Sequence, residues 1–510
     1  MKENDPKQSR LLLAAVLLAV FVVPSSISGT AIALPWISQD VPADLASLQW
    51  VVNAFNLTFA CFTLVWGRLS DVIGRKRAFV IGAGLYAFAS AGTAMSSDIL
   101  WLDSFRSLAG VGGAAIFACG SALLMNTFEG HRRTQAFALF GTTAGLGITL
   151  GPTISGILLV LSGWQAIFIL HAVVLILVLC LTIKLPDDRA TDRSVSEIDI
   201  IGSGLFISSM FLLMLTLSKG YDWGWRSLPS LICLSGSLLL FVGFVRHIRR
   251  TANPVLSLSL LSNNRFMGYI LVPVVASFTF VTLLTYFPTY LTGTLQMPAS
   301  AAGLMMLCLT LPVLLFPLIA GRLAAKGVPP SFLMYLSLVC MLAGVGGLLL
   351  GIETMQSVWV SGSCLFLVGT GMGFSAGLVD GEALSCVEPD DIGMAAGLLN
   401  TFRLGSEAIA VALYGSFVSS VLTALVAEPL TDFTTAAQSD WVTAIASGNA
   451  STLIAELTDD QASIQMSLVA EMLKLAFLTT NCLLLIIAGC VSVVVVLKLR
   501  KCHPARPVQA

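Results

Sequence analysis

Charged residues are scarce in this chain. Only 11% of its 510 residues are charged, 56% are hydrophobic, and the mean hydropathy is +0.90. A soluble globular domain carries about 25% charged residues. The composition therefore excludes a soluble fold and indicates a polytopic membrane protein. The formal net charge of −1 gives no indication of nucleic-acid binding.

The sequence also lacks the common motifs of catalysis and of metal binding. None of its four histidines stands in an HExxH or HxxxxD pattern, and no GxxxxGK[ST] phosphate-binding loop is present. The 11 cysteines form no CxxC pair, and ten lie in apolar segments, where a free thiol behaves as a small hydrophobic side chain. These absences argue against an ATPase, a membrane-embedded acyl- or glycosyltransferase and a disulfide framework. We expect no enzyme activity, no metal and no cofactor.

Long apolar runs are plentiful instead. A membrane helix needs about 20 largely apolar residues, and polar residues divide the chain into fourteen such runs: 11–37, 47–67, 78–97, 99–126, 134–160, 164–184, 198–218, 228–246, 266–293, 300–321, 331–352, 357–386, 393–425 and 470–498. The first run is too long for the apolar core of a signal peptide, so we interpret it as a retained membrane helix. An even number of spans places both termini on one side.

The basic residues orient these spans. With both termini inside, 22 of the 27 Lys and Arg residues fall in cytoplasmic segments, as the excess of positive charge in cytoplasmic loops requires. Two of the other five, Arg106 and Arg403, lie within spans. We therefore predict a multi-pass protein of the cell (inner) membrane with both termini cytoplasmic.

A degenerate repeat divides the chain into halves. "GRLSDVIGRKR" (67–77) follows the second run and "GRLAAKG" (321–327) follows the tenth, and transporter halves related by internal repeats leave such traces. The predicted fold class is an all-α membrane protein of 14 transmembrane helices, with two six-helix bundles and two helices inserted between them. The predicted parts are an N-terminal bundle (1–184), a linker with the two extra helices (185–265, helices within 198–246), a C-terminal bundle (266–499) with an external loop (426–469), and a cytoplasmic tail (500–510).

The first copy of the repeat closely resembles GxLaDrxGrk, the loop signature that follows the second helix in the major facilitator superfamily. Leu69 and five residues that we assign to a conformational gate match: Gly67, Asp71, Gly74, Arg75 and Lys76. Glycine allows close helix contact or a tight turn, and Asp71 could face a helix N-terminus or a cation across the seam between the halves. The alternative is an ordinary basic cytoplasmic loop.

A second stretch, "GITLGPTISG" (147–156), resembles gxxxGPxxGG, the signature of the antiporter branches of this superfamily. The matching residues are Gly147, Gly151, Pro152 and Gly156. Small residues at this spacing let helices approach closely, and the proline removes a backbone hydrogen bond. The alternative is generic small-residue packing.

Together with "ALP" (33–35), "WVVNAF" (50–55) and "GMAAGLLNTFRLGSEAIAVALYG" (393–415), these motifs resemble the fourteen-helix drug:proton antiporter family over the whole chain. The resemblance implies a secondary active transporter that exports drugs or other amphipathic compounds by proton-coupled alternating access, functional as a monomer. Its partners would be a small-molecule substrate, protons and the lipid bilayer, with no nucleic acid. Alternatives are an exporter of a metabolite such as a siderophore, and an importer or uniporter without proton coupling.

Charges within the spans are the candidate coupling residues, because burying them in a membrane costs several kcal/mol. "RSLAGVGGAA" (106–115) resembles the family's helix-4 motif, which implies a coupling role for Arg106, whereas Ser26 stands where the family's helix-1 acid is expected. Four other acids could carry protons or bind substrate: Asp103, Asp380, Glu407 and, less strongly indicated, Glu382. Asp103 could pair with Arg106, and Glu407 with Arg403, each one helical turn away.

Three neutral residues complete the candidate set. Asn53 and Asn56 could line a polar cavity or act as hydrogen-bonding contacts between helices. His171 is interpreted as a packed polar residue rather than a proton relay.

Overall fold

The computed structural model describes residues 6–41, 43, 45–183, 185, 198–354, 358–426, 438–447 and 459–500. These residues form helices and no strand. Thirteen of the helical stretches that they form are long and apolar enough to cross a membrane. A further helix, α3 (Arg75–Ala94), begins with three basic residues and packs between α4 and α6 within the same bundle. The predicted all-α membrane architecture is confirmed, and with α3 the number of helices agrees with the fourteen predicted spans.

The first six helices form one half of the molecule, which we call the N-half. They are α1 (Pro6–Asp40), α2 (Leu45–Ile73), α3, α4 (Ile99–Thr127), α5 (Gly130–Ser162) and α6 (Gln165–Ile183). The most buried of these is α4. Its glycines make this packing possible, because a Cβ atom on Gly112 would lie 2.7 Å from the carbonyl oxygen of Gly82 on α3.

The other half, which we call the C-half, contains interrupted spans. Its elements are α10 (Asn264–Ile270), α11 (Val272–Ala276), the π-helical turn η2 (Ser277–Val281), α12 (Thr282–Gly293), α13 (Ala299–Ala325), α14 (Pro330–Thr354), α15 (Val358–Ser375), α16 (Leu378–Leu384), α17 (Ile392–Val426) and α20 (Asp459–Arg500). Gly377, with a φ of 79°, interrupts the span formed by α15 and α16. A Cβ atom there would lie 2.0 Å from the carbonyl oxygen of Phe137 on α5. The break therefore brings the two halves into backbone contact.

Two helices lie outside both halves. α7 (Ile200–Trp223) packs against both α2 and α17, and α8 (Leu228–Ile248) packs on α7. Asp199 joins the ends of this pair: its carboxylate lies 2.7 Å from Nε2 of His247 and accepts a 3.2 Å hydrogen bond from the Val255 amide. The inserted pair therefore covers one side of the seam between the halves. The exact domain boundaries predicted from the sequence stay a prediction.

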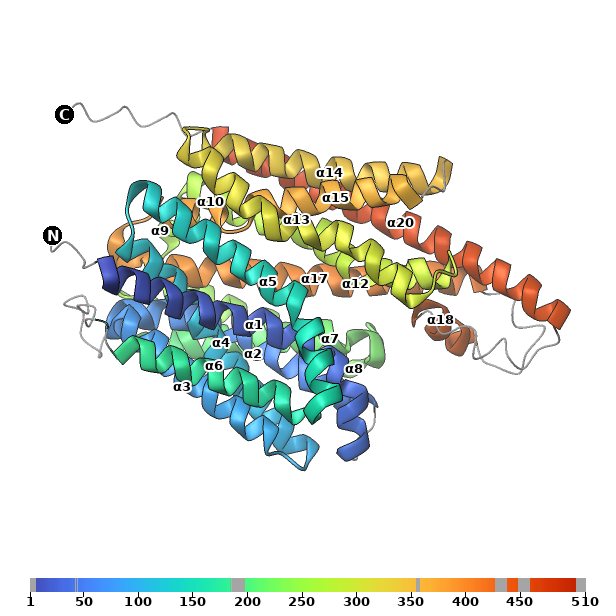
Figure 1. The fold of residues 1–510 in the computed structure, drawn as a ribbon, viewed down its shortest axis with the longest axis horizontal. Coiled ribbons are helices and arrows are strands. Elements are labelled where there is room, and N and C mark those ends of the chain that lie inside the picture. The colour runs from blue at the N-terminus through green and yellow to red at the C-terminus, as the bar shows by residue number, and fades with distance from the viewer. Residues whose placement is uncertain are drawn as a thin grey trace.

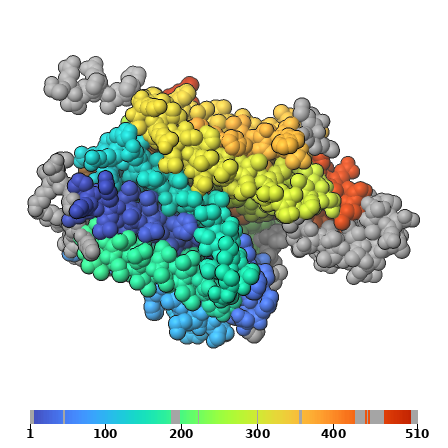
Figure 2. All heavy atoms as spheres, in the orientation of Figure 1, coloured from blue at the N-terminus to red at the C-terminus, as the bar shows by residue number. Residues whose placement is uncertain are grey.

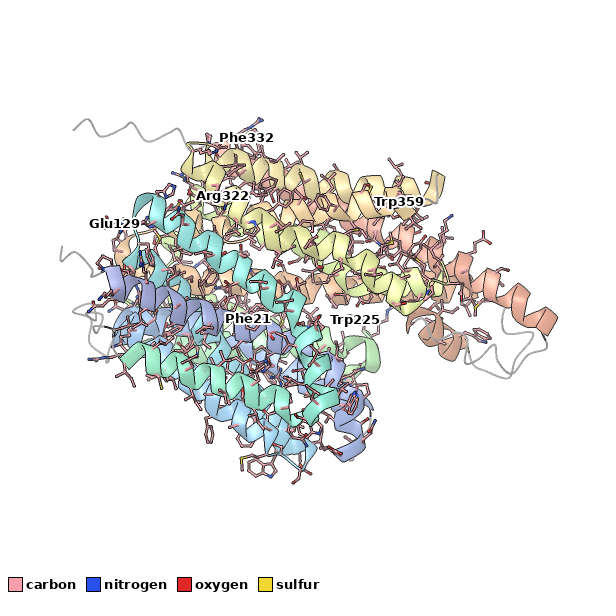
Figure 3. All side chains as sticks on the ribbon, in the orientation of Figure 1. Phe21, Glu129, Trp225, Arg322, Phe332 and Trp359 are labelled. Atoms are coloured by element: carbon pink, nitrogen blue, oxygen red, sulfur yellow. The ribbon has the colours of Figure 1, made fainter. Side chains whose placement is uncertain are left out.

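The helices run along the long axis of the molecule (Figure 1). α1 begins and α20 ends at one end, which we call the termini end, and the short helix α18 (Gln438–Ser447) lies at the opposite, far end. Glu129 and Arg322 mark the termini end, while Trp225 and Trp359 lie toward the far end (Figure 3). On the face drawn in Figure 2, the N-half and the C-half meet along a seam where α5 contacts α13.

Candidate functional site

A cavity of about 1030 Å³ lies between the two halves. Its walls come from α1 and α2 of the N-half, from the inserted helix α7, from η2, α12, α17 and α20 of the C-half, and from α18. Pockets of about 300–1,000 Å³ hold drug-sized molecules. The cavity is therefore large enough for a small organic molecule.

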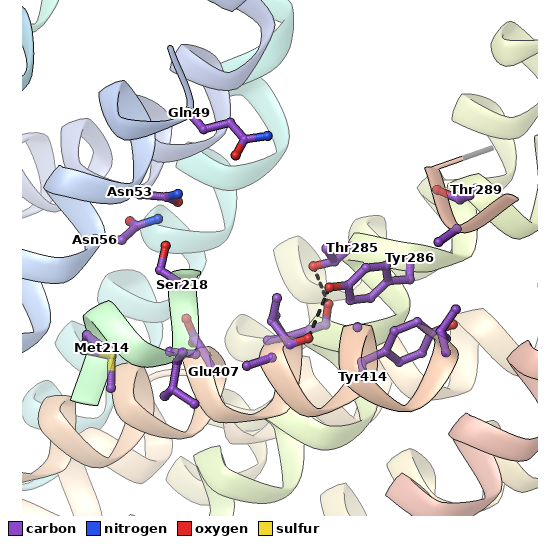
Figure 4. A pocket seen from close by; sticks show the side chains of 18 of the residues that line it. Gln49, Asn53, Asn56, Met214, Ser218, Thr285, Tyr286, Thr289, Glu407 and Tyr414 are labelled. Carbon is purple, nitrogen blue, oxygen red and sulfur yellow. Dashed lines mark hydrogen bonds between the residues drawn. The ribbon is translucent and has the colours of Figure 1, made fainter. Parts of the chain in front are cut away.

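The amide groups of the cavity come from the N-half, and a hydroxyl group from α7 lies beside them. Gln49, Asn53 and Asn56 on α2 and Ser218 on α7 line it, and Figure 4 shows them gathered on one side, across from the tyrosines of the C-half. Asn53 and Asn56 thus line a cavity, which is the first of the two roles considered for them; the other was hydrogen bonding between helices. Amide groups both donate and accept hydrogen bonds, so this wall can bind polar groups of either kind.

The opposite wall is aromatic. The rings of Tyr286 (α12) and Tyr414 (α17) stack with centroids 4.0 Å apart, and the Tyr286 hydroxyl donates a 3.1 Å hydrogen bond to the carbonyl of Val411. Tyr290 stacks on Phe477 of α20 at 4.5 Å. Because these rings fix one another, they present a rigid apolar surface to the cavity.

One carboxylate, Glu407 on α17, lines this cavity (Figure 4). It makes no ion pair with Arg403, because Arg403 points to other groups: it lies 2.9 Å from a carboxylate oxygen of Asp380 on α16 and donates a 2.9 Å hydrogen bond to Asn400. Within the part of the chain that the structure describes, Glu407 has no hydrogen-bond or ion-pair partner on its side chain. Its carboxylate is therefore available to a ligand or a proton.

Two of the other candidate acids are engaged elsewhere. Asp380 is 2% exposed and pairs with Arg403 away from the cavity. Glu382, two residues on, lies 3.7 Å from Arg265 near the start of α10. These two acids thus occupy different faces of α16, and neither lines the cavity.

Arg106 is fully buried within the N-half. Its Nε donates a 2.8 Å hydrogen bond to the carbonyl of Val51 on α2, its Nη1 donates a 3.0 Å bond to Ser26, and the guanidinium lies 4.6 Å from the ring centroid of Phe55. Among the described residues, no ion pair joins it to Asp103. His171 lies beside Arg106 and is 3% exposed. Ser26 thus contacts the arginine directly, but as a neutral acceptor.

The five gate residues lie at the termini end, where α2 meets the start of α17. The carboxylate of Asp71 accepts hydrogen bonds of 2.9 and 2.8 Å from the backbone amides of Gly393 and Met394. Arg75 lies 3.3 Å from Asp71 and donates to the carbonyl of Pro389. An acid at a helix N-terminus satisfies amides that have no partner within the helix and complements the helix dipole.

Glycine makes this contact close. A Cβ atom on Gly67 would lie 2.2 Å from the carbonyl oxygen of Gly393, so the two backbones touch. Gly74 has a φ of 98°, a conformation that favours glycine, in the turn before α3. Lys76 donates to the carbonyl of Leu185 at the end of the N-half. The seam is therefore sealed at the termini end.

The residues of the second glycine motif pack α5 on α1. A Cβ atom on Gly147 would lie 2.7 Å from the carbonyl oxygen of Phe21, and one on Gly151 would lie 2.9 Å from that of Ser25. Pro152 lies inside α5. A Cβ atom on Gly156 would meet no neighbouring atom within 4 Å, so only the first two glycines are required by packing.

Sequence reasoning missed the aromatic wall and the contribution of α7. The stretch "TLLTYFPTY" (282–290) supplies Thr285, Tyr286, Thr289 and Tyr290 to the cavity. Hydroxyl groups recurring every three or four residues in an apolar run were the available signal. Nothing comparable distinguishes Met214 and Leu217 of α7 from residues that face lipid.

The comparisons with known proteins agree on one family. Residues 16–411 match the family model described as Major Facilitator Superfamily. The multidrug resistance protein Stp of Mycobacterium tuberculosis is 28% identical over 81% of this chain and 76% of its own length, and the riboflavin transporter RibZ of Clostridioides difficile is 28% identical over 82% and 90%. The solved proton:xylose symporter XylE superposes with a TM-score of 0.57 over 93% of this chain and 95% of its own, at 14% identity, and supports the fold alone.

Proposed function

Because this chain belongs to the major facilitator superfamily, we propose that it is a secondary active transporter that exports small amphipathic molecules, drugs among them, in exchange for protons. Members of this superfamily are transporters, not enzymes. Relatives named for drug resistance or for antibiotic export, such as the probable actinorhodin transporter of Streptomyces coelicolor (28% identical over 77% of this chain and 69% of its own length), support export.

The observation that carries the proposal is a cavity between two halves whose seam is sealed at one end. The contact of Asp71 with the start of α17 closes the termini end, whereas the cavity residues Gln49 and Trp225 lie near the far ends of α2 and α7. Alternating access requires such a seal to break while the opposite end closes. We further propose that the termini end faces the cytoplasm, which the distribution of basic residues supports. In this orientation the structure corresponds to an outward-facing state of a monomeric transporter in the cell (inner) membrane.

The cavity suits an amphipathic cation. Its aromatic wall accepts an apolar body, its amides accept or donate hydrogen bonds, and Glu407 supplies one negative charge that makes no ion pair with any residue the structure describes. Burying an unpaired charge is costly, so the Glu407 carboxylate favours binding either a cationic cargo or a proton. The cationic cargo and the proton compete for this one carboxylate. Binding of one therefore displaces the other, and the two are exchanged without contacting each other.

Everted membrane vesicles test this proposal with ethidium as the cargo. In respiring vesicles that contain the protein, ethidium should release part of the stored pH gradient, read as recovery of a quenched acridine dye. Glu407→Gln should abolish this release. Glu353→Gln, the same change at an exposed position at the end of α14, should preserve it.

Two results would overturn parts of the proposal. Ethidium uptake without proton release would indicate a uniporter, which Ser26 in place of the expected acid would explain. Release that persists in Glu407→Gln would remove this residue from the site.

A further inference from the structure

The N-half contains a concentration of buried polar atoms that lack hydrogen bonds. Six side chains contribute one atom each that has no partner at full hydrogen-bond geometry, although the Tyr86 hydroxyl faces Arg106 and Ser26, and we call them the N-half polar column: Thr30 on α1, Tyr86 and Ser90 on α3, Asp103 and Arg106 on α4, and His171 on α6. The large majority of buried side-chain polar atoms in proteins have a partner, and an ordered water or ion is one of the explanations for an exception. The column lies apart from the cavity, because none of its residues lines it.

These side chains are stacked in two layers. In the deeper layer, Tyr86 and His171 lie beside Arg106, which is fully buried and bonded to Ser26. Ser90 lies one helical turn from Tyr86, Asp103 one turn from Arg106, and Thr30 one turn from Ser26, in each case toward the far end.

Asp103 is the outermost charged member. It stands on the second turn of α4, which begins at Ile99, or about 6 Å along the helix axis at 1.5 Å per residue. Its side chain is half-buried, and its Oδ1 is fully buried without a hydrogen-bond partner among the described residues. One charged group, Arg106, acts electrostatically on it, and Arg106 in turn faces Tyr86. The carboxylate thus connects the far end to the buried column.

We propose that the N-half polar column binds internal water molecules, and that this water makes Asp103 a proton-binding site separate from Glu407. A buried water makes two to four hydrogen bonds, which the six unpaired atoms can provide. A proton from water at the far end forms an O–H bond on the Asp103 carboxylate, and the acid becomes neutral. Its role in coupling rests on the proposed transport function; its hydration and protonation do not.

The contacts of Arg106 explain how protonation would reach the cavity. When Asp103 is ionised, its charge and the α2 groups Val51 and Phe55 act on the guanidinium together. When Asp103 is protonated, it no longer attracts the guanidinium, so the contacts of Arg106 with α2 hold this side chain more strongly. Asn53 and Asn56, which line the cavity, lie on the same helix within five residues of Val51. The site therefore acts on the cavity through α2.

Radiolytic hydroxyl-radical labelling tests the bound water. Radicals formed from internal water label adjacent side chains even when bulk solvent cannot reach them. Tyr86, which is fully buried, should be labelled rapidly, whereas Tyr269, which is 1% exposed and lies beside Arg265, should not. Replacing Thr30 by Val and Ser90 by Ala should lower Tyr86 labelling to the level of Tyr269. Labelling of Tyr86 no faster than that of Tyr269 in the unmodified protein would overturn the proposal.

Infrared difference spectroscopy of the purified protein tests the proton site. Acidification should produce the C=O band of a protonated carboxylic acid that is missing in Asp103→Asn. The matched control is Asp98→Asn, an exposed acid that caps α4, where asparagine can also cap. This variant should retain the band. An unchanged band in Asp103→Asn would refute protonation of this residue.

Transport assays separate this inference from the proposed function. Asp103→Asn should lose export driven by a pH gradient but retain ethidium counterflow, which needs no net proton movement. Normal gradient-driven export by this variant would overturn the coupling role. Absence of ethidium counterflow in the unmodified protein would instead refute the proposed cargo, while the labelling and infrared results would still decide on the water and the proton.

Discussion

Replacing Asp71 by Asn should release the seal at the termini end. The carboxylate accepts hydrogen bonds from two backbone amides at the start of α17, those of Gly393 and Met394, and lies 3.3 Å from Arg75. An asparagine keeps one acceptor oxygen and directs an NH₂ group at the second amide. A hydrogen bond to a charged group contributes about 1.5–3 kcal/mol and an acid at a helix N-terminus about 0.3–1 kcal/mol. We therefore expect the sealed state to lose about 2–3 kcal/mol relative to states open at this end.

This loss corresponds to an increase of about 30- to 150-fold in the population of open states while the sealed state still dominates. The assay is the labelling rate of a cysteine introduced at Ser70, which is 1% exposed in the sealed seam. The cysteine is introduced into a variant in which all 11 native cysteines are replaced. A membrane-impermeant maleimide is then added to everted vesicles that contain this variant. Since only open states react, the rate should rise in proportion to their population.

Asp391→Asn is the matched control on the same seam. Asp391 lies 4.0 Å from Arg68, and its side chain is 22% exposed. A partly exposed pair contributes about 0–1 kcal/mol, so its loss should raise the rate about fivefold at most. Equal labelling rates in the Asp71 and Asp391 variants would refute the idea that the amides of α17 hold the seal.

Three further changes have defined outcomes. Gly67→Ala should widen the α2–α17 distance measured between spin labels at the termini end, because its Cβ would lie 2.2 Å from a backbone oxygen; Gly156→Ala, with open space around it, should not. Arg403→Met should lower the melting temperature by leaving Asp380 as an unpaired buried charge, a cost of about 3–5 kcal/mol, and adding Asp380→Asn should recover most of the loss. Tyr286→Ala should weaken ethidium binding, measured by fluorescence titration, about tenfold, whereas Tyr286→Phe, which keeps the stacked ring, should change it little.

Much of the architecture followed from local sequence patterns. The apolar runs predicted the membrane helices, since each run is long enough to span a bilayer and interrupted by polar residues. The gate motif indicated that Asp71 could face a helix N-terminus across the seam, and the structure places it against the first amides of α17. Such features depend on residues that are close in sequence, or on a motif whose residue types already indicate which group it contacts.

Charge pairing depended on contacts that no local pattern contains. Spacing alone favoured the pairs Asp103–Arg106 and Arg403–Glu407, because each pair shares one helix face. In the structure, Arg403 pairs with Asp380 from another helix, which leaves Glu407 at the cavity. Arg106 turns instead to Val51 and to an aromatic ring on α2. The partner of a long arginine side chain is set by tertiary packing, which the sequence of one helix does not determine.

The inserted helix α7 has a mechanical consequence. It packs on both halves, and its contact with α2 is mostly apolar, with Leu57, Ala60, Cys61 and Met214 among the side chains that meet there, while Lys219 lies 5.8 Å from the ring centroid of Trp50. Dispersion contacts are individually weak and non-directional, so such a surface tolerates displacement better than hydrogen bonds of fixed geometry do. At the termini end, by contrast, Asp199 clamps the pair through directional bonds. Directional bonds thus hold the two inserted helices to each other, while their mostly apolar contact with α2 allows one half to move along them and keeps the flank of the cavity closed to lipid.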